Sequence, residues 1–181
     1  MAIRRALTLA LLLAATVAGA VDGPKDAVVR RIKAAFLYKF ASYVEWPVDS
    51  FADSASPIVI GVAGAEQLGR ELEQAVAGRE VASRTLLVRH LKRGEAAGAC
   101  CHILFVGADT EPKGAHELLA GTMGQPVLTV TEAKGALPEG SVINFLPVDD
   151  RVRFDISREA AERNGLQLRS QLLGVARQVS R

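Results

Sequence analysis

Short apolar segments alternate with amphipathic segments along most of this chain, and this alternation constrains its fold more than any other feature. Residues 57–63 form a continuously apolar run bounded by proline and glycine, which is typical of a buried strand. The following segment, 66–77, carries apolar residues at every fourth position, which is the spacing of one helix face. A strand followed at once by a helix, in a chain where this order recurs, predicts an α/β fold with a largely parallel sheet.

The remaining segments fit the same architecture. We expect further strands at 85–91, 100–106 and 126–130, and helices at 28–46, 112–120 and 167–179. Near the end, 141–147 and 151–156 are interpreted as the strands of a hairpin joined through residues 148–150. Ser157 can cap a further helix, which Gly165 ends. The sequence thus predicts a single α/β domain, with a mostly parallel sheet flanked by helices and a C-terminal β-hairpin and helices.

The leading helix, 28–46, lies outside the strand–helix alternation. Its apolar residues recur at three- and four-residue spacing, and they are Val29, Ile32, Phe36, Phe40 and Tyr43. We expect this apolar side to pack across one face of the sheet. Pro47 is expected to end the helix, because the residue before a proline avoids helical backbone angles.

The first 20 residues have the features of a secretory signal peptide. Two arginines precede an apolar run that is too short to span a membrane, and Ala18-Gly19-Ala20 supplies the small residues of a cleavage site. We expect residues 1–20 to be removed and residues 21–181 to form a soluble exported protein; an uncleaved anchor is the alternative. The mature segment has 20 basic and 20 acidic residues, and such a neutral protein without a basic stripe is a poor partner for nucleic acid.

The only two cysteines, Cys100 and Cys101, are adjacent. A disulfide between neighbours closes no useful loop, so it cannot act as a structural staple. The surrounding residues are interpreted as a buried strand, on which successive side chains face opposite ways. We expect one thiol to pack as a small hydrophobic group and the other to point away, with a vicinal or intermolecular disulfide as the alternative.

The sequence contains no catalytic motif. It lacks GxSxG, HExxH and CxxC, and we expect no catalytic, cofactor or metal site. The three histidines are isolated in the sequence: His90, His102 and His116. The glycine-rich turn at 61–69 lacks the lysine of a P-loop and is interpreted as a plain tight turn, although its helix N-terminal amides could bind an anion. Asp149 and Asp150 are interpreted as solvated turn residues.

Aromatic residues are concentrated in one short part of the chain. Six of its nine aromatic side chains fall between Phe36 and Phe51. Tyr38 lies almost opposite Phe36 on the helical wheel, and Trp46 lies at the expected end of the helix. Aromatic residues outside a core stripe are candidates for a protein interface, so Tyr38 and Trp46 are the expected partner-binding residues. The alternative is that Trp46 folds back over the helix end.

Several blocks of sequence occur in an order that is typical of one known family. The stretch 32–40 is followed by Val44-Glu45-Trp46-Pro47, and further blocks lie at 101–105, 143–145, 151–156 and within 160–173. In this order the chain resembles the YfiR-like periplasmic proteins over nearly the whole mature segment. The helix that ends in Trp-Pro is the most specific part of the resemblance.

The resemblance implies a regulator and not an enzyme. YfiR-like proteins bind the periplasmic sensory portion of an inner-membrane diguanylate cyclase and repress it, which lowers cyclic-di-GMP and biofilm formation. An OmpA-like outer-membrane lipoprotein can sequester such a repressor, and homodimers are typical. The resemblance therefore implies a periplasmic location and no cofactor.

The chain departs from the family pattern at two places. The better-known repressor has separated cysteines in disulfides, so its redox control cannot be carried over to adjacent Cys100 and Cys101. Ser157 stands where the family often has asparagine, and both residue types cap helices. An alternative function is a periplasmic small-ligand-binding module that uses the carboxyl ends of the strands, around 61–66 and 107–110. A hydrolase is disfavoured, because no nucleophile and base are found together.

Overall fold

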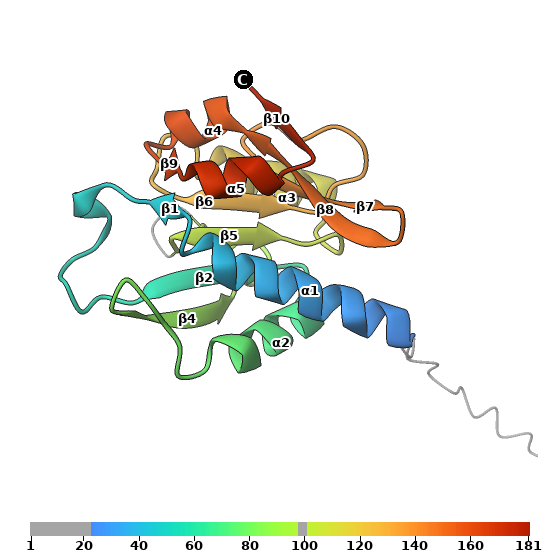
Figure 1. The fold of residues 1–181 in the computed structure, drawn as a ribbon, viewed down its shortest axis with the longest axis horizontal. Coiled ribbons are helices and arrows are strands. Elements are labelled where there is room, and N and C mark those ends of the chain that lie inside the picture. Colours follow the sequence, from blue (N-terminus) through green and yellow to red (C-terminus); the bar gives the residue numbers. More distant parts are fainter. Residues whose placement is uncertain (1–22, 98–100) are drawn as a thin grey trace, which may run out of the picture.

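Eight strands form one mixed sheet in the computed structural model, which describes residues 23–97 and 101–181 (Figure 1). In spatial order they are β10 (Gln178–Ser180), β8 (Arg151–Ser157), β7 (Ile143–Val148), β6 (Leu128–Thr131), β5 (Ile103–Val106), β2 (Ile58–Ala63), β4 (Arg84–His90) and β3 (Glu80–Val81). The expected signal peptide, 1–20, lies outside the described residues.

The five central strands are parallel, in the order β4-β2-β5-β6-β7. This is the 2-1-3-4-5 order of doubly wound sheets, in which the chain reverses its direction of travel between β2 and β5. Antiparallel β8 follows β7 as a hairpin, and β10 then pairs with β8 in parallel. The predicted mostly parallel α/β sheet with a hairpin near its C-terminal end is confirmed.

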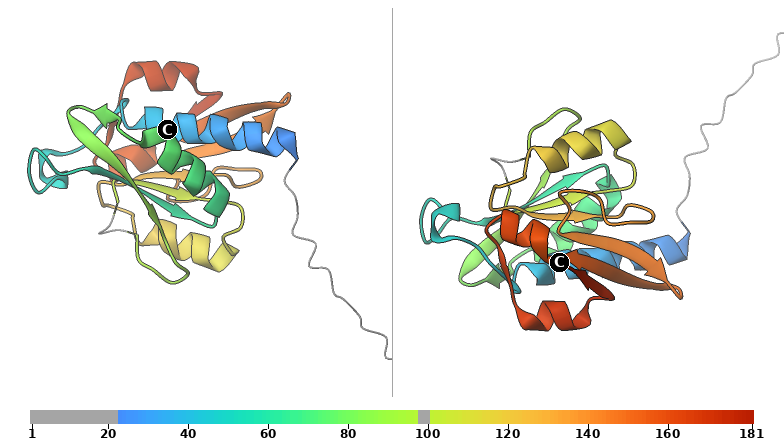
Figure 2. Two further views of the ribbon diagram at one scale, coloured as in Figure 1. Left: turned by 90° about the horizontal axis from the view of Figure 1, so that it is seen from below. Right: turned by 90° about the horizontal axis from the view of Figure 1, so that it is seen from above.

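Helices cover both faces of the sheet. Figure 2 shows α3 (Pro112–Ala120) on one face and α1 (Pro24–Phe40) with α2 (Glu66–Val76) on the other. The short helices α4 (Arg158–Arg163) and α5 (Ser170–Val175) lie at the β8 side of the molecule (Figure 1). A 3₁₀ turn, η1 (Val48–Ser50), lies in the connection to β2.

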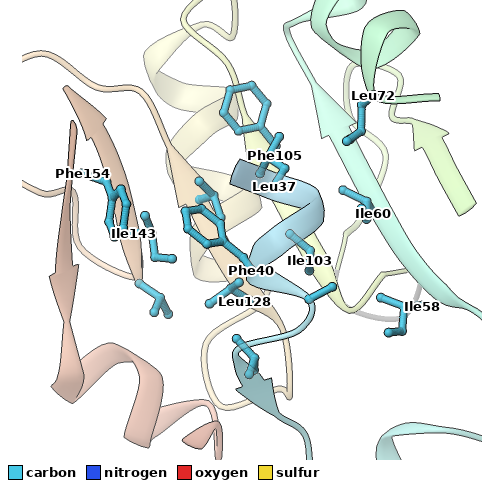
Figure 3. Close-up of a cluster of buried hydrophobic side chains, with 14 of the residues drawn as sticks. Leu37, Phe40, Ile58, Ile60, Leu72, Ile103, Phe105, Leu128, Ile143 and Phe154 are labelled. Atoms are coloured by element: carbon cyan, nitrogen blue, oxygen red, sulfur yellow. The ribbon is translucent and has the colours of Figure 1, made fainter. Parts of the chain in front are cut away.

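The central strand β5 shows how the core is divided between the two faces. Ile103 and Phe105 contribute to the cluster under α1 and α2, whereas Leu104 and Val106 pack under α3. This alternation follows from the two-residue period of a strand, and all four side chains are buried because both faces are covered. Figure 3 shows side chains of α1 facing this central part of the sheet.

The leading helix is displaced relative to its prediction. It begins at Pro24, since a proline at the first helical position needs no N–H partner, and it ends at Phe40 instead of continuing to residue 46. Val44–Glu45 forms strand β1, which pairs antiparallel with β9 (Gln167–Leu168). The buried residues are Ala34, Leu37 and Phe40, while Ile32 of the predicted apolar face is 39% exposed.

The predicted long C-terminal helix is wrong. Only α5 is helical in this part of the chain, while β9 before it pairs with β1 and β10 after it pairs with β8. Ala176 already has extended backbone angles, φ −67° and ψ 147°. Apolar residues at about every fourth position are compatible with a helix. In the folded chain, β9 pairs with β1 at Val44 and β10 pairs with the edge of β8, and the hydrogen bonds of these strands decide the conformation.

The predicted hairpin and cap are confirmed. Asp149 and Asp150 link β7 to β8, with φ values of 48° and 55°. Two consecutive left-handed residues form the tight turn whose twist matches that of paired strands, and aspartate tolerates this conformation. The Ser157 hydroxyl accepts a hydrogen bond from the Ala160 N–H at 3.1 Å and so caps α4.

The cysteine prediction is partly tested. Cys101 is buried, 6% exposed, and its Sγ lies 3.2 Å from the carbonyl oxygen of Ala97. Cys100 lies outside the described residues. The strand β5 begins at Ile103, and just before it the His102 backbone still pairs with both neighbours, donating to the Val59 carbonyl and accepting from the Leu128 N–H. Within the described part of the chain, no helix has the length and apolar character that a membrane span requires.

Candidate functional site

Four of the six aromatic residues between Phe36 and Phe51 form two groups. Phe36 and Phe40 of α1 join the core, where the ring of Phe40 lies 5.8 Å from Phe145 and 5.3 Å from Phe154. Trp46 and Phe51 lie instead on the connection from β1 to β2, which projects at the end of the sheet where the parallel strands begin (Figure 1). We call residues 46–57 the connecting segment. The core therefore explains only part of the aromatic excess.

Trp46 is partly buried within a small aromatic group of the connecting segment. Its ring lies edge-on to Phe51 and to His102, with 6.3 Å between centroids in each case. The Phe51 ring is stacked on the His102 imidazole at 4.4 Å and an interplanar angle of 11°. The buried indole Nε1 has no hydrogen-bond partner among the described residues.

His102 joins the connecting segment to the start of β2. Its Nδ1 accepts a hydrogen bond from the Val59 N–H at 3.1 Å, and its Nε2 lies 3.1 Å from the Ser50 carbonyl. Burial lowers the pKa of His102 from its ordinary value, the Ser50 carbonyl opposes this shift, and the Arg84 guanidinium adds to it. This histidine is therefore hydrogen-bonded within the fold through both ring nitrogens.

Arg84 holds the other half of the connecting segment. Its Nη1 donates to the carbonyl oxygens of Asp53 at 2.8 Å and Ser56 at 2.7 Å. The guanidinium carbon lies 3.8 Å from the centroid of the Phe51 ring, which is a cation–π contact. The connecting segment is thus held by two residues. His102 directly precedes β5, and Arg84 is the first residue of β4.

Tyr38 lies in a separate environment. It is partly buried against the core, and the guanidinium carbon of Arg79 lies 5.1 Å from the centroid of its ring. Arg79 follows α2 and precedes β3, so Tyr38 and Trp46 both lie toward the end of the sheet where the parallel strands start. Tyr38 and Trp46 thus lie at the same end of the molecule, but their rings contact different side chains.

A hollow of about 410 Å³ lies at the opposite end of the sheet. It is lined by Arg30, Lys33, Gly64, Ala65, Glu66, Gln67, Leu68, Arg70, Asp109 and Glu132. The Gly107 N–H donates to the Ala63 carbonyl and the Asp109 N–H to the Gly64 carbonyl, so the turns at the carboxyl ends of β2 and β5 adjoin. The hollow therefore lies at the point between β2 and β5 where doubly wound sheets often bind ligands.

The charges around this hollow are largely paired. Lys33 forms an ion pair with Glu132, whose other oxygen accepts a hydrogen bond from the Ala108 N–H at 2.7 Å. Arg30 pairs with Glu71 at 3.2 Å. Helix α2 begins here at Glu66 without a side-chain cap. The hollow is thus polar and charged on both sides, which suits a small polar molecule better than an apolar one.

The two remaining histidines, His90 and His116, lie in different environments. His90 in β4 is held between two carboxylates of α2, with Nε2 3.0 Å from Glu73 and Nδ1 3.3 Å from Glu66. His116 lies on the exposed side of α3. Across 23–97 and 101–181, no three histidine, cysteine or acidic side chains come together as a metal site would require.

Sequence reasoning did not find His102 or Arg84 as partners of the connecting segment. The nearest signal was the position of His102 inside an apolar run, where an isolated polar side chain requires a hydrogen bond. Its partners lie 43 and 52 positions away in the chain, so no local pattern could identify them.

The comparisons with known proteins cover most of the chain. Curated proteins give no match. A family model described as YfiR/HmsC-like matches residues 30–177. These residues include α1 from Arg30 onward, the connecting segment, α5 and every strand of the sheet except β10. The chain therefore belongs to the YfiR/HmsC-like family.

Proposed function

We propose that this protein is a periplasmic repressor that binds the periplasmic sensory portion of an inner-membrane diguanylate cyclase. Binding lowers cyclic-di-GMP and thereby biofilm formation. The single observation that supports this proposal is the family match over residues 30–177. In this proposal residues 1–20 are a cleaved signal peptide, the mature chain is a homodimer without enzymatic activity, and an OmpA-like outer-membrane lipoprotein is a second partner.

The proposed partner surface lies at the end of the sheet that carries Tyr38 and Trp46. Both residues are partly buried and pack against the core cluster. Val48 of the same connecting segment is 96% exposed. A partly exposed aromatic group beside an exposed apolar side chain has the composition of an interface centre.

The experiment begins with deletion of the gene in cells that contain the cognate cyclase. Cyclic-di-GMP should rise, and the full-length protein supplied in trans should restore the original level. An unchanged cyclic-di-GMP level in the deletion strain would exclude the repressor role. Direct binding is tested with the purified mature chain and the periplasmic portion of the cyclase, by calorimetry.

A second candidate function is binding of a small polar molecule in the hollow between α1 and the start of α2. The volume of about 410 Å³ and the uncapped helix beside Arg30 and Lys33 favour this candidate. Thermal melting with a panel of small anions and zwitterions tests it. A ligand-dependent increase in melting temperature that Lys33→Ala removes, in a protein that does not bind the cyclase, would favour this function over repression.

A further inference from the structure

One imidazole connects residues 46–51 to the sheet. The His102 ring bridges the Val59 N–H of β2 and the Ser50 carbonyl, and the Phe51 ring is stacked on it. The backbone N–H of His102 also donates to the Val59 carbonyl at 2.9 Å, so the backbone and the side chain both fix the position of this residue. Any change in the charge of the ring therefore acts on three contacts at once.

The hydrogen bonds define the protonation state of the ring. A backbone N–H can only donate, so the His102 Nδ1 that faces Val59 must carry a lone pair and no proton. The proton of the neutral ring then lies on Nε2, which donates to the Ser50 carbonyl. A second proton on Nδ1 would place two donors face to face, and the ring would have to move away from Val59.

The surrounding charges also disfavour an imidazolium at this place. From β4, Arg84 lies over the Phe51 ring on which His102 is stacked, and β2 presents only the Val59 amide. The connecting segment has two acidic residues, Asp49 and Asp53. Asp53 directs its carboxylate to the Ala55 N–H and the Ser56 hydroxyl, and Asp49 is exposed on η1. Neither forms an ion pair with His102 within the described part of the chain.

The half of the connecting segment that His102 holds contains buried polar atoms that lack a hydrogen bond to the described residues. Trp46 Nε1 and Ser50 Oγ are buried, and neither finds a hydrogen-bond partner among the residues that the structure describes. Release to solvent would allow water to bind both groups, which offsets part of the lost packing. The Asp53–Ser56 half has its own anchor in the two hydrogen bonds from Arg84.

We propose that His102 is a pH-sensitive latch, and that protonation of its imidazole on acidification releases residues 46–50 while Arg84 retains residues 51–56 through Phe51, Asp53 and Ser56. Release exposes the indole of Trp46 without unfolding the sheet. The latch follows from the contacts of His102 alone and does not depend on the identity of a partner.

The experiment uses Trp46 as an intrinsic probe, because it is the only tryptophan of the chain. The mature protein is titrated from about pH 8 to about pH 4, because histidine ordinarily changes its charge between about pH 5 and pH 8 and burial lowers the pKa of His102. We expect the emission maximum to move to longer wavelength and acrylamide quenching to increase severalfold, while far-UV circular dichroism stays constant. Emission intensity is not used, because an imidazolium quenches a neighbouring indole directly.

The variant His102→Gln should remove the pH response, since an amide can neither gain a proton nor become cationic in this interval. His116→Gln is the matched control and should respond as the wild-type protein does, because His116 is exposed on α3. A pH response that persists in His102→Gln, or a wild-type emission maximum that is constant over the interval, would overturn the proposal.

A second measurement needs no variant and applies even if His102→Gln does not fold. The imidazole resonances of the three histidines are followed by NMR over the same pH interval. One of them should titrate with the same midpoint as the Trp46 emission maximum, and its chemical shifts at high pH should be those of the Nε2–H tautomer. A fluorescence midpoint that matches no such resonance would contradict the latch.

Discussion

The side chain of Asn144 pairs with the backbone of Ala133 as a neighbouring strand would. Its Oδ1 accepts a hydrogen bond from the Ala133 N–H at 2.8 Å, and its Nδ2 donates to the Ala133 carbonyl at 3.1 Å. Oδ1 also accepts from the Thr131 hydroxyl at 2.7 Å, and Asn144 is fully buried. The amide thus extends the contact between β6 and β7 beyond Thr131, where the regular pairing ends.

Replacement of this amide should destabilise the fold. Asn144→Ala leaves the N–H and the carbonyl of Ala133 without their partner, whereas the Thr131 hydroxyl keeps its hydrogen bond with Ser141 at 2.9 Å. Each polar group left unsatisfied away from water costs about 1–3 kcal/mol. We expect the free energy of unfolding to fall by about 3 kcal/mol in urea denaturation. Gln178→Ala on the exposed strand β10 is the control and should change stability by less than about 0.5 kcal/mol. Equal effects of the two substitutions would contradict the bridging role of Asn144.

Gly61 and Cys101 are expected to be energetically coupled. A Cβ added at Gly61 would lie 2.8 Å from the Cys101 Sγ, which is too close for any normal contact. Gly61→Ala should therefore cost about 1–3 kcal/mol through overpacking. In a Cys101→Ala background the same change should cost less, because the sulfur is gone. A double-mutant cycle by chemical denaturation measures this difference, and strictly additive free energies would refute the coupling.

The proposed partner surface predicts different effects for ring and hydroxyl at Tyr38. Tyr38→Ala should weaken binding to the cyclase by about 2 kcal/mol, or about thirtyfold in Kd, because it removes an aromatic interface group. Tyr38→Phe keeps the ring under Arg79 and should bind nearly as the wild-type protein does. Trp46→Ala should weaken binding similarly, with Trp46→Phe as its control. If both alanine variants bind normally, the partner surface lies elsewhere on the protein.

Stability should depend on pH through His102. Its pKa is lowered in the folded protein, chiefly by burial, so the unfolded state binds more protons once the pH falls below the ordinary histidine value of about 6.5. The stabilisation is therefore complete above about pH 6.5 and is lost as the pH falls from there through the folded-state pKa. Urea denaturation at a series of pH values measures this slope. His102→Gln should flatten it, and a slope of opposite sign would show that the folded protein prefers the protonated ring.

Signal cleavage predicts a mature N-terminus at Val21. The small residues at positions 18 and 20 are those that signal peptidase requires. N-terminal sequencing of protein from the periplasm checks this expectation. Replacing Ala18 and Ala20 with arginine should block processing, whereas Gly19→Ala should not. Recovery of chains that begin at Met1 from the membrane fraction of wild-type cells would contradict cleavage.

The sequence by itself determined the elements whose signals are local. The apolar run of β2, the apolar residues at every fourth position of α2 and the proline that begins α3 each predicted an element close to its observed bounds. The Asp149–Asp150 turn and the Ser157 cap were also predictable, because both depend on side chains within a few residues of the backbone groups that they serve. The order of these elements was sufficient to predict a mostly parallel sheet.

Only the tertiary structure decided the conformation of segments whose partners are distant. Val44 became a strand residue because Leu168 lies beside it, and Gln178–Ser180 became one because the edge of β8 was open to pairing. The contact between His102 and Ser50 spans 52 positions and left no periodic trace in the sequence. The physical reason is that periodicity reports which side of an element is apolar, whereas a hydrogen bond between distant segments depends on how the whole chain packs.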